Sequence, residues 1–287
     1  MTVIRVASLD SPGLGYPGLD DPRLDDYRNI PDPALAASRG VFIAEGRMVV
    51  RRLLERSRFT TRSLLLTPAA LASFADLDAR LAGLPVYLMD QQAMNAVAGF
   101  DIHRGCLAAG ERGPSPAWQA VIAEAHTVVV LERVANADNV GGIFRNAAAL
   151  GADAVLLDQA STDPLYRKAI RTSMGAALHV PFAVMTDWPG DLGRLRAAGF
   201  TLVALTPAVG ARTLTDVASQ LGAQPGTGRR IALLLGHEGS GLSDEALAAA
   251  GMHARIPMAT GVDSLNVATA AAIALYEIRG KGGGHRG

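Results

Sequence analysis

The chain has 287 residues, of which 49% are hydrophobic, and its mean hydropathy is +0.20. These values predict a globular protein with two domains or one large domain, and they exclude a disordered chain. The formal net charge is zero, so any binding of nucleic acid must rest on a local cluster of basic residues.

Membrane, secreted and metal-binding proteins are disfavoured by the same sequence. It has no run of 18 or more apolar residues, and its start, MTVIRVASLDSPG, lacks the apolar core of a signal peptide. We therefore expect a cytoplasmic protein with no membrane partner. The single cysteine, Cys106, excludes an internal disulfide and a cysteine-based zinc cluster, and is expected to be a buried, inert thiol. The six histidines show no metal-ligand spacing, so no metal is expected.

Residues 1–30 are rich in Pro, Gly and Asp and are interpreted as an irregular lead-in without an assigned element. Residues 31–110 then alternate between strand and helix patterns, which predicts a small α/β domain. Strands are expected at 40–46, 62–68, 85–90 and 103–109, and helices at 47–57, 68–83 and 91–99.

Charge is unevenly distributed over this N-terminal part. Residues 1–27 hold five aspartates against two arginines, which is typical of a solvated surface. Residues 39–62 hold seven arginines against two glutamates. In that cluster Arg47, Arg51 and Arg52 are candidate RNA contacts, and a solvated helix face is the alternative.

Residues 111–118, ERGPSPAW, contain two prolines and a glycine and are predicted to link this domain to a second one at 119–280. Six apolar runs separated by helical patterns follow, which predicts a parallel sheet covered on both faces. The runs are TVVVL, AVLLD, HVPFAV, TLVAL, IALLL and ARIPM. Ligands of such sheets bind beyond the carboxyl ends of the strands. The tail at 281–287 is expected to be disordered.

The run IALLL at 231–235 leads into a glycine-rich loop, GHEGSG, at 236–241. Glycines at 236, 239 and 241 let a ligand approach the backbone closely. Glu238 would repel a phosphate, the loop has no Lys, and its spacing does not fit GxGxxG. A phosphate cradle and a dinucleotide-dependent oxidoreductase are therefore disfavoured, and a plain strand-to-helix turn is the remaining alternative to a ligand site.

A helix at 243–250, a strand at 254–258 and an alanine-rich last helix complete the chain's pattern. The alanines allow the last helix to pack very close to a neighbour. Asp263 or Ser264 can cap it. A cap explains one polar residue, and does not explain Ser264 and Asn266 together.

Three segments resemble motifs of the SpoU (TrmH) family of RNA ribose 2′-O-methyltransferases, in the SPOUT superfamily. GHEGSGLSDE and IPMATGVDSLNVATAAAIALYE resemble its second and third motifs. LERVANADNVGGIFRNAAALGADAVLL resembles its first, Asn-x-Gly-x-x-x-Arg, through Asn139, Gly141 and Arg145. The resemblance implies a homodimer and a C-terminal parallel-sheet α/β domain with a trefoil knot that binds S-adenosylmethionine. It also implies a smaller L30e-like α/β domain that binds RNA, which FIAEG and HRG match less specifically.

The resemblance assigns roles to two groups of residues. Those implied to contact the cofactor are Thr206, Gly236, Gly239, Ile256, Met258 and Leu265. Those implied to lie at the reacting centre are Asn139, Arg145, Glu238, Ser264 and Asn266. A guanidinium keeps its proton at neutral pH, so we expect Arg145 to clamp a phosphate rather than to act as a base. Arg167, Lys168 and Arg171 form a second basic stripe, which is either RNA-facing or solvated.

The quoted motifs are shared by enzymes that modify transfer RNA and enzymes that modify large-subunit ribosomal RNA. The additional N-terminal domain favours 23S ribosomal RNA, because it could hold a folded RNA element. A non-catalytic RNA- or cofactor-binding protein is the other hypothesis, which the presence of Arg145, Asn139, Glu238 and Asn266 disfavours. His237 stands where relatives often have Asn, Ser or Ala, and no catalytic role is assigned to it.

Overall fold

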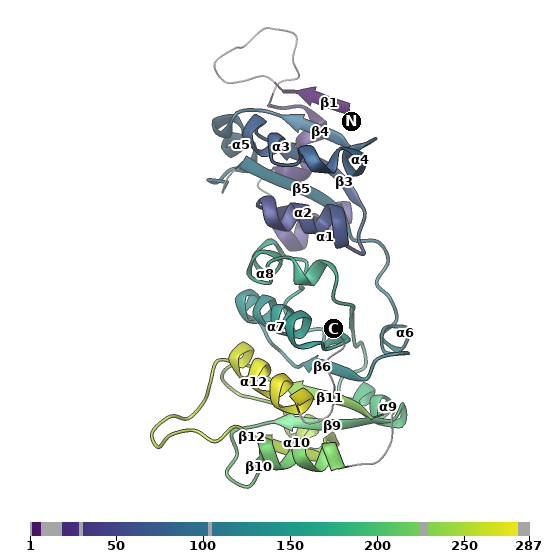
Figure 1. Ribbon diagram of the computed structural model, residues 1–287, viewed down its shortest axis with the longest axis vertical. Helices are drawn as coiled ribbons and strands as arrows, with labels where there is room; N and C mark the ends of the chain where they lie inside the picture. The colour runs from purple at the N-terminus through teal and green to yellow at the C-terminus, as the bar shows by residue number, and fades with distance from the viewer. Residues whose placement is uncertain (1, 7–18, 29–30, 103–104, 224–228, 281–287) are drawn as a thin grey trace. The chain divides into compact units, whose positions relative to one another are not determined.

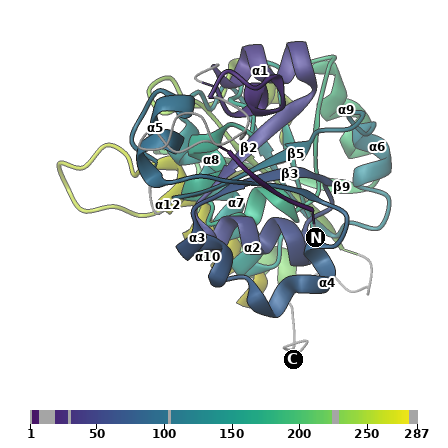
Figure 2. The ribbon, with the colours of Figure 1, turned by 90° about the horizontal axis from the view of Figure 1, so that it is seen from above.

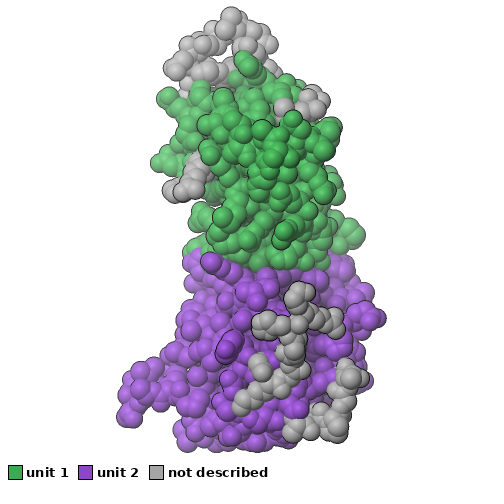
Figure 3. Space-filling view, viewed as in Figure 1, with its two compact units in different colours: residues 1–114, 165–179 green, residues 115–164, 180–287 purple. Residues whose placement is uncertain are grey.

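The structure is a computed structural model that describes the chain except for residues 1, 7–18, 29–30, 103–104, 224–228 and 281–287 (Figure 1). The chain forms two units, one of residues 1–114 and 165–179 and one of residues 115–164 and 180–287 (Figure 3). The division after residue 114 falls inside the predicted linker. Residues 165–179, which the sequence assigned to the C-terminal domain, cluster with unit 1.

Unit 1 contains a five-stranded mixed sheet in the order β1-β4-β3-β5-β2. Strands β1, β4 and β3 are parallel, and β5 runs antiparallel to β3 and β2. The strands are β1 (Thr2–Arg5), β2 (Val41–Glu45), β3 (Thr61–Leu66), β4 (Pro85–Leu88) and β5 (Cys106–Glu111). The helices are η1 (Pro22–Tyr27), α1 (Asp32–Arg39), α2 (Arg47–Arg56), α3 (Pro68–Ala72), η2 (Ala75–Leu77), α4 (Asp78–Leu81), α5 (Gln91–Ala98), α8 (Arg167–Thr172) and η4 (Ala176–Leu178).

Helices cover both faces of this sheet, because successive strand residues point to opposite sides. Val41 and Ile43 of β2 join the cluster that also holds Leu35 of α1 and Met94 of α5. Figure 2 shows α1 and α5 on one side of the strands and α2, α3 and α4 on the other. The amphipathic α2 buries Val49, Val50, Leu53 and Leu54 and leaves its arginines outside the core.

Two predictions for unit 1 were wrong. Two parts of the expected irregular lead-in form regular elements, because β1 pairs with β4 and η1 buries Leu24 and Tyr27. The Tyr27 hydroxyl lies 2.7 Å from the Ser63 hydroxyl inside the core. The helix expected at 68–83 is broken into α3, η2 and α4. At its first break the Ser73 hydroxyl donates to the Ala70 carbonyl, which competes with the regular helical hydrogen bonds.

The one cysteine behaves as the sequence predicts. Cys106 is fully buried at the start of β5, and burial raises the pKa of its thiol to about 12. The thiol is therefore protonated and unreactive at neutral pH. In the part of the chain that the structure describes, three or more His, Cys, Asp or Glu side chains nowhere form a metal-binding group. Within the same residues, every helix is too short or too polar to cross a membrane.

Unit 2 contains a seven-stranded parallel sheet in the order β10-β12-β9-β11-β6-β7-β8. The strands are β6 (Thr127–Leu131), β7 (Ala154–Leu157), β8 (Phe182–Val184), β9 (Phe200–Leu205), β10 (Arg212–Thr213), β11 (Arg230–Leu235) and β12 (Met252–Arg255). The helices are α6 (Trp118–Val121), α7 (Ala137–Leu150), α9 (Gly190–Ala197), α10 (Leu214–Ala223), α11 (Asp244–Ala249) and α12 (Val267–Gly280). The parallel sheet is confirmed, and each of the six apolar runs overlaps a strand. The strand expected at 254–258 is displaced, because β12 ends at Arg255, and no run marks β10.

Both faces of the unit 2 sheet are buried, which explains why its strands are continuous apolar runs. Val128 and Val130 of β6 face the cluster that contains Trp118 of α6 and Leu192 of α9. The intervening Val129 is equally buried on the opposite face. Each fully buried Val or Leu contributes roughly 1.5–3 kcal/mol relative to an exposed one, so these runs dominate the stability of the unit.

Helices α7 and α12 lie side by side (Figure 1). A Cβ added at Gly142 of α7 would stand 2.9 Å from the Cβ of Ala268 of α12, so the two backbones are as close as small residues allow. The Asn146 amide donates to the Ala268 carbonyl over 2.7 Å. The alanine-rich helix therefore packs tightly, as the sequence predicts, and it holds the segment before α12 next to the start of α7.

Arg133, just after β6, has a left-handed backbone conformation with φ 55°. Its backbone N–H donates to the Asp158 carboxylate over 3.0 Å, which holds the chain in this shape. A non-glycine residue in this region costs about 1 kcal/mol. Replacing Arg133 with Gly is expected to raise the Tm by roughly 2–4 °C in thermal denaturation. An unchanged or lower Tm would show that the arginine side chain itself stabilises the turn.

Candidate functional site

A cavity of about 280 Å³ lies where the carboxyl ends of β9, β11 and β12 meet the start of α12. Its volume is close to the lower end of the roughly 300–1,000 Å³ that small-molecule sites occupy. The lining residues are Leu205, Thr206, Pro207, Leu235, Gly236, His237, Glu238, Gly239, Gly241, Ile256, Met258, Asp263, Ser264, Leu265, Val267 and Ala270. The position follows the rule that parallel sheets bind ligands beyond the carboxyl ends of their strands.

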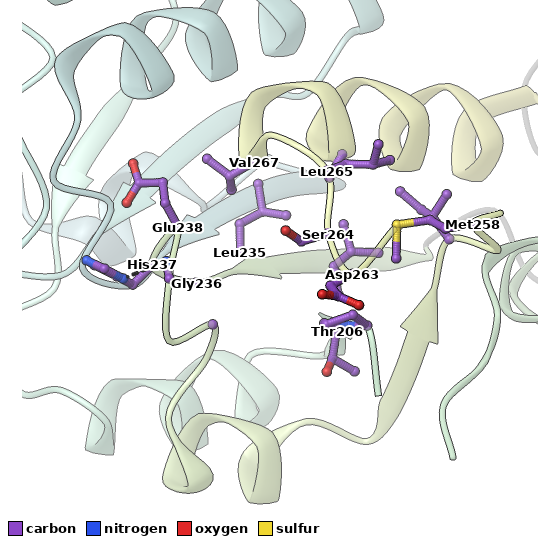
Figure 4. A pocket seen from close by; sticks show the side chains of 16 residues that line it. Thr206, Leu235, Gly236, His237, Glu238, Met258, Asp263, Ser264, Leu265 and Val267 are labelled. Atoms are coloured by element: carbon purple, nitrogen blue, oxygen red, sulfur yellow. Dashed lines mark hydrogen bonds between the residues drawn. The ribbon is translucent and has the colours of Figure 1, made fainter. Parts of the chain in front are cut away.

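The structure brings together most of the residues that the sequence proposed for a site. All six implied cofactor residues line the cavity: Thr206, Gly236, Gly239, Ile256, Met258 and Leu265. Glu238 and Ser264, implied to lie at the reacting centre, line it as well. In Figure 4, Thr206, Asp263 and Ser264 lie between Met258 and Leu265 on one side and the loop from Gly236 to Glu238 on the other.

The glycine loop after β11 is closed on itself. His237 and Gly241 exchange two backbone hydrogen bonds, of 3.1 and 2.9 Å. The closure brings the Gly241 backbone so near to Gly236 that a Cβ at Gly236 would stand 2.2 Å from the Gly241 carbonyl carbon. No side chain fits there, so the glycine at 236 is required by a close backbone approach. The loop thus presents backbone rather than side chain to the cavity.

A chain of hydrogen bonds next to the cavity joins its three loops. The Asn139 amide of α7 donates to the Glu238 carboxylate over 2.8 Å, and the Asn266 amide donates to the Asn139 side-chain oxygen over 2.7 Å. The Asn136 backbone N–H approaches the same Glu238 oxygen at 3.4 Å. Asn139 is 8% exposed, so its amide depends on these partners. The network fixes the loop after β11 and the segment before α12 to the start of α7.

The carboxylate determines the direction of every hydrogen bond in this network. An ionised carboxylate only accepts, so Asn139 must turn its NH₂ group to Glu238 and its oxygen to Asn266. Asn266 then donates a hydrogen bond to Asn139 through its NH₂ group. Its side-chain oxygen accepts hydrogen bonds from the backbone N–H groups of Ala268 and Thr269 at 3.0 and 3.2 Å. The predicted cap, Asp263 or Ser264, was therefore wrong. Asn266 caps α12 and also joins the network, because its two ends serve different partners.

The pKa of Glu238 makes this network sensitive to acid. Partial burial raises that pKa, but hydrogen bonds from Asn139 and from the backbone of Glu238 and Asn136 lower it by more, so it lies below its usual 4.5. A depressed pKa contributes stability that is present above pH 4.5 and is lost as the pH falls below it. Glu238→Gln is expected to lower the Tm by roughly 2 °C at pH 7.

The difference in Tm between the wild type and Glu238→Gln should shrink as the pH is lowered from 5 towards 3, since the wild-type carboxylate then takes up its proton. Thermal denaturation followed by circular dichroism across this range measures it. A constant difference at all pH values would contradict a charged Glu238 in the network.

Arg145 is not brought into the cavity. It lies on α7 six residues after Asn139, and its side chain is exposed while that of Asn139 is buried. Among the described residues the Arg145 guanidinium has no hydrogen bond or ion pair. An arginine without an internal partner is available to bind an anion from solution.

The arginines proposed as RNA contacts lie in unit 1, and several have partners there. Arg51 forms ion pairs with Asp76 and Glu55 at 2.7 and 3.1 Å. Arg52 donates to the Met174 carbonyl, and the buried Nε of Arg47 has no hydrogen-bond partner among the described residues. In the second stripe, Arg167 pairs with Asp32 at 3.0 Å, Arg171 pairs with Glu45 at 3.4 Å, and Lys168 also interacts within the described chain.

Several cavity residues were not proposed from the sequence. Asp263, interpreted as a helix cap, lines the cavity instead. Pro207 lines it next to Thr206, and no motif marks this position. The signal that could have found both is their place in segments that leave the carboxyl ends of strands. The parallel sheet, the cavity at its carboxyl edge and the polar network beside it together define an α/β protein built to bind a small ligand.

Comparison with known proteins identifies the family. The SpoU rRNA Methylase family matches residues 126–276. An uncharacterized tRNA/rRNA methyltransferase of Mycobacterium bovis is 46% identical over 89% of this chain and 86% of its own length. The 23S rRNA (guanosine-2′-O)-methyltransferase RlmP of Bacillus subtilis is 27% identical over 83% of this chain and 88% of its own.

A solved structure supports the same assignment. The AdoMet-bound rRNA methyltransferase from Sinorhizobium meliloti is 28% identical and superposes with a TM-score of 0.76. The match covers 96% of this chain and 97% of that structure's chain. The chain belongs to the SpoU rRNA Methylase family and is an RNA methyltransferase. The resemblance stated from the three sequence motifs is confirmed.

Proposed function

We propose that this protein transfers a methyl group from S-adenosylmethionine to a ribose 2′-hydroxyl of 23S ribosomal RNA. The observation that carries the proposal is the cavity of unit 2, where the implied cofactor residues meet and the hydrogen-bonded chain of Glu238, Asn139 and Asn266 borders it. The family supplies the reaction class, and the named relative RlmP is a ribose 2′-O-methyltransferase.

The residues of the cavity fit the methyl donor. Its walls are apolar at Leu235, Ile256, Met258, Leu265 and Val267, which suits an adenine ring. The glycines at 236, 239 and 241 let a ligand approach the backbone of this loop closely. Thr206, Asp263 and Ser264 supply polar groups for the ribose and the amino acid part. When bound, S-adenosylmethionine supplies an electrophilic methyl group on a sulfonium.

The chain's own residues then act by positioning. Asn139, Glu238 and Asn266 hold the loops that form the cavity at fixed distances. Ser264, on the cavity wall, lies where it can orient the ribose. Arg145 binds the phosphate next to the target ribose, because a guanidinium matches a phosphate with two parallel hydrogen bonds and keeps its proton. The proton of the hydroxyl passes to that phosphate or to water.

Ribosomal RNA is the favoured substrate, and transfer RNA is the alternative. RlmP acts on 23S rRNA and matches 83% of this chain, including the part before the family match. We assign RNA binding to the L30e-like part at 31–110, which carries Arg47, Arg51 and Arg52. Arg51 is ion-paired and Arg52 donates to a carbonyl, but a guanidinium keeps its charge in such contacts. The three arginines can therefore still attract a phosphate backbone, with the strength falling as salt rises.

We also propose that the protein is a homodimer and that the chain of unit 2 forms a trefoil knot. Helix α12 exposes Ile273 at 38% and Tyr276 at 69%, and Val262 before it is 48% exposed. Ile273 and Tyr276 are three positions apart on α12 and so share one face of the helix, and an exposed apolar face supports an interface between proteins. The strand order of unit 2, in which β11 lies between β9 and β6, and the packing of α12 on α7 support the trefoil knot. An enzyme that acts on ribosomal RNA is expected to work in the cytoplasm.

The test incubates the protein with S-adenosylmethionine labelled in its methyl group and with separate pools of transfer RNA and ribosomal RNA that lack 2′-O-methyl marks. We expect label in 23S rRNA at a single nucleotide. Label in transfer RNA alone would overturn the substrate. Label in neither pool, from protein that binds the cofactor, would favour a non-catalytic role.

A further inference from the structure

His237 sits in the glycine loop that lines the cavity, and its imidazole braces that loop. Its Nδ1 atom accepts hydrogen bonds from the backbone N–H groups of Gly239 at 2.9 Å and Ser240 at 3.2 Å. Its own backbone is paired with Gly241 across the loop. The side chain therefore crosses the inside of the turn and satisfies two N–H groups that the backbone leaves without partners.

These two bonds require one state of the imidazole. Nδ1 can accept only when it carries no proton, so the ring must be neutral with its proton on Nε2. A doubly protonated ring turns Nδ1 into a donor that points at two other donors. Protonation must therefore either break both bonds or move the ring out of the turn.

The loop held in this way forms one wall of the cavity. Gly236, Glu238, Gly239 and Gly241 all line it, and Glu238 is the carboxylate that accepts from Asn139. A change in the turn between His237 and Gly241 would move this wall and displace the carboxylate from its partner.

We propose that His237 is a positioning residue whose neutral imidazole holds the glycine loop in the form that binds the methyl donor, so that protonation of His237 weakens that binding. The inference rests on the proposed function, since it concerns the same cavity. An asparagine can make the same turn with its side-chain oxygen, because Asn accepts from backbone N–H groups two or three residues ahead. The histidine thus adds a response to pH that an asparagine lacks.

Other charged groups lie on the elements around this loop. Glu238 follows His237 directly, Glu132 and Arg133 follow β6, Asp138 begins α7, Asp244 and Glu245 begin α11, and Asp263 lines the far side of the cavity. Carboxyl groups ordinarily titrate near pH 4 and arginine does not titrate in the physiological range. An imidazole is the side chain that ordinarily changes charge between pH 5 and 8. The ligand's own amino group is common to all variants.

The experiment measures the affinity of the full-length protein for S-adenosylhomocysteine by calorimetry between pH 5.5 and 7.5. The wild type is expected to bind about tenfold more weakly at pH 5.5, the scale of two lost hydrogen bonds. His237→Asn should bind within about threefold of the wild type at pH 7.5 and lose this pH dependence. His237→Ala should bind weakly at both pH values. A wild type without pH dependence, or His237→Asn with the wild-type dependence, would overturn the inference.

A second measurement does not depend on ligand binding. In protein labelled with ¹⁵N at histidine, the ring nitrogen shifts are expected to show His237 protonated on Nε2 alone at pH 7.5. An Nδ1–H tautomer at that pH would overturn the inference. Absence of heat with S-adenosylhomocysteine at every pH, together with the expected tautomer, would instead count against the proposed function and leave the brace itself intact.

Discussion

Replacing Arg145 with Ala is expected to lower kcat for RNA methylation by roughly 10²–10³-fold, the scale of removing one well-placed charged group from a reacting centre. The affinity for S-adenosylmethionine should stay unchanged, because Arg145 does not line the cavity. Single-turnover transfer of labelled methyl groups measures the rate of methylation, and calorimetry measures the affinity for S-adenosylmethionine. Arg145→Lys should recover only part of the rate, since an ammonium cannot bind a phosphate with two parallel bonds.

Arg196 on α9 supplies the matched control. Its side chain is exposed like that of Arg145, but α9 packs on the other face of the unit 2 sheet. Arg196→Ala should methylate RNA at the wild-type rate. An Arg145→Ala protein that turns over normally would remove Arg145 from the reacting centre.

Replacing Gly236 with Ala is expected to weaken S-adenosylmethionine binding by about 100-fold or more, the scale of roughly 3 kcal/mol. The added Cβ would lie 2.2 Å from the Gly241 carbonyl carbon and 2.3 Å from the Leu242 nitrogen. Both are backbone atoms, so the loop has to open to relieve the overlap. Calorimetry on folded protein gives the loss of affinity.

Gly193 on α9 is the control for the glycine substitution. A Cβ there meets no atom within 4 Å, and alanine is favoured over glycine in a helix by roughly 0.5–1 kcal/mol. Gly193→Ala should therefore bind the cofactor normally and be slightly more stable. Normal affinity in Gly236→Ala would show that the cavity is not the cofactor site, or that the loop is free to open.

The sequence was most informative where periodicity and burial coincide. Strands β6, β7, β9 and β11 of unit 2 are buried along most of their length, so each is a continuous apolar run, and all four were found. Strand β10 was missed because two residues, Arg212 and Thr213, carry no pattern. Strand β1 and the buried Leu24 and Tyr27 of η1 were missed because the apolar residues of this stretch stand among Pro, Gly and Asp, which hide any strand or helix periodicity.

The motifs predicted part of the site, and the contacts between its side chains were visible only in the structure. The motifs named eight of the residues that line the cavity. The direction of the hydrogen bonds between Glu238, Asn139 and Asn266 follows only from their contacts. The dual role of Asn266, as cap and as donor, depends on its two ends facing different elements. Likewise, a cluster of arginines is visible in a sequence, whereas the ion pair of Arg51 with Asp76, which is 25 residues away, is not.

The central claim, methyl transfer to a ribose 2′-hydroxyl, is tested most directly by alkaline hydrolysis of RNA that the enzyme has labelled. A 2′-O-methyl group removes the hydroxyl that attacks the adjacent phosphate, so the bond after the labelled nucleotide resists alkali. The label is expected in an alkali-resistant dinucleotide, which Arg145→Ala should form roughly 10²–10³-fold more slowly. Label released as a mononucleotide methylated on its base would contradict the account.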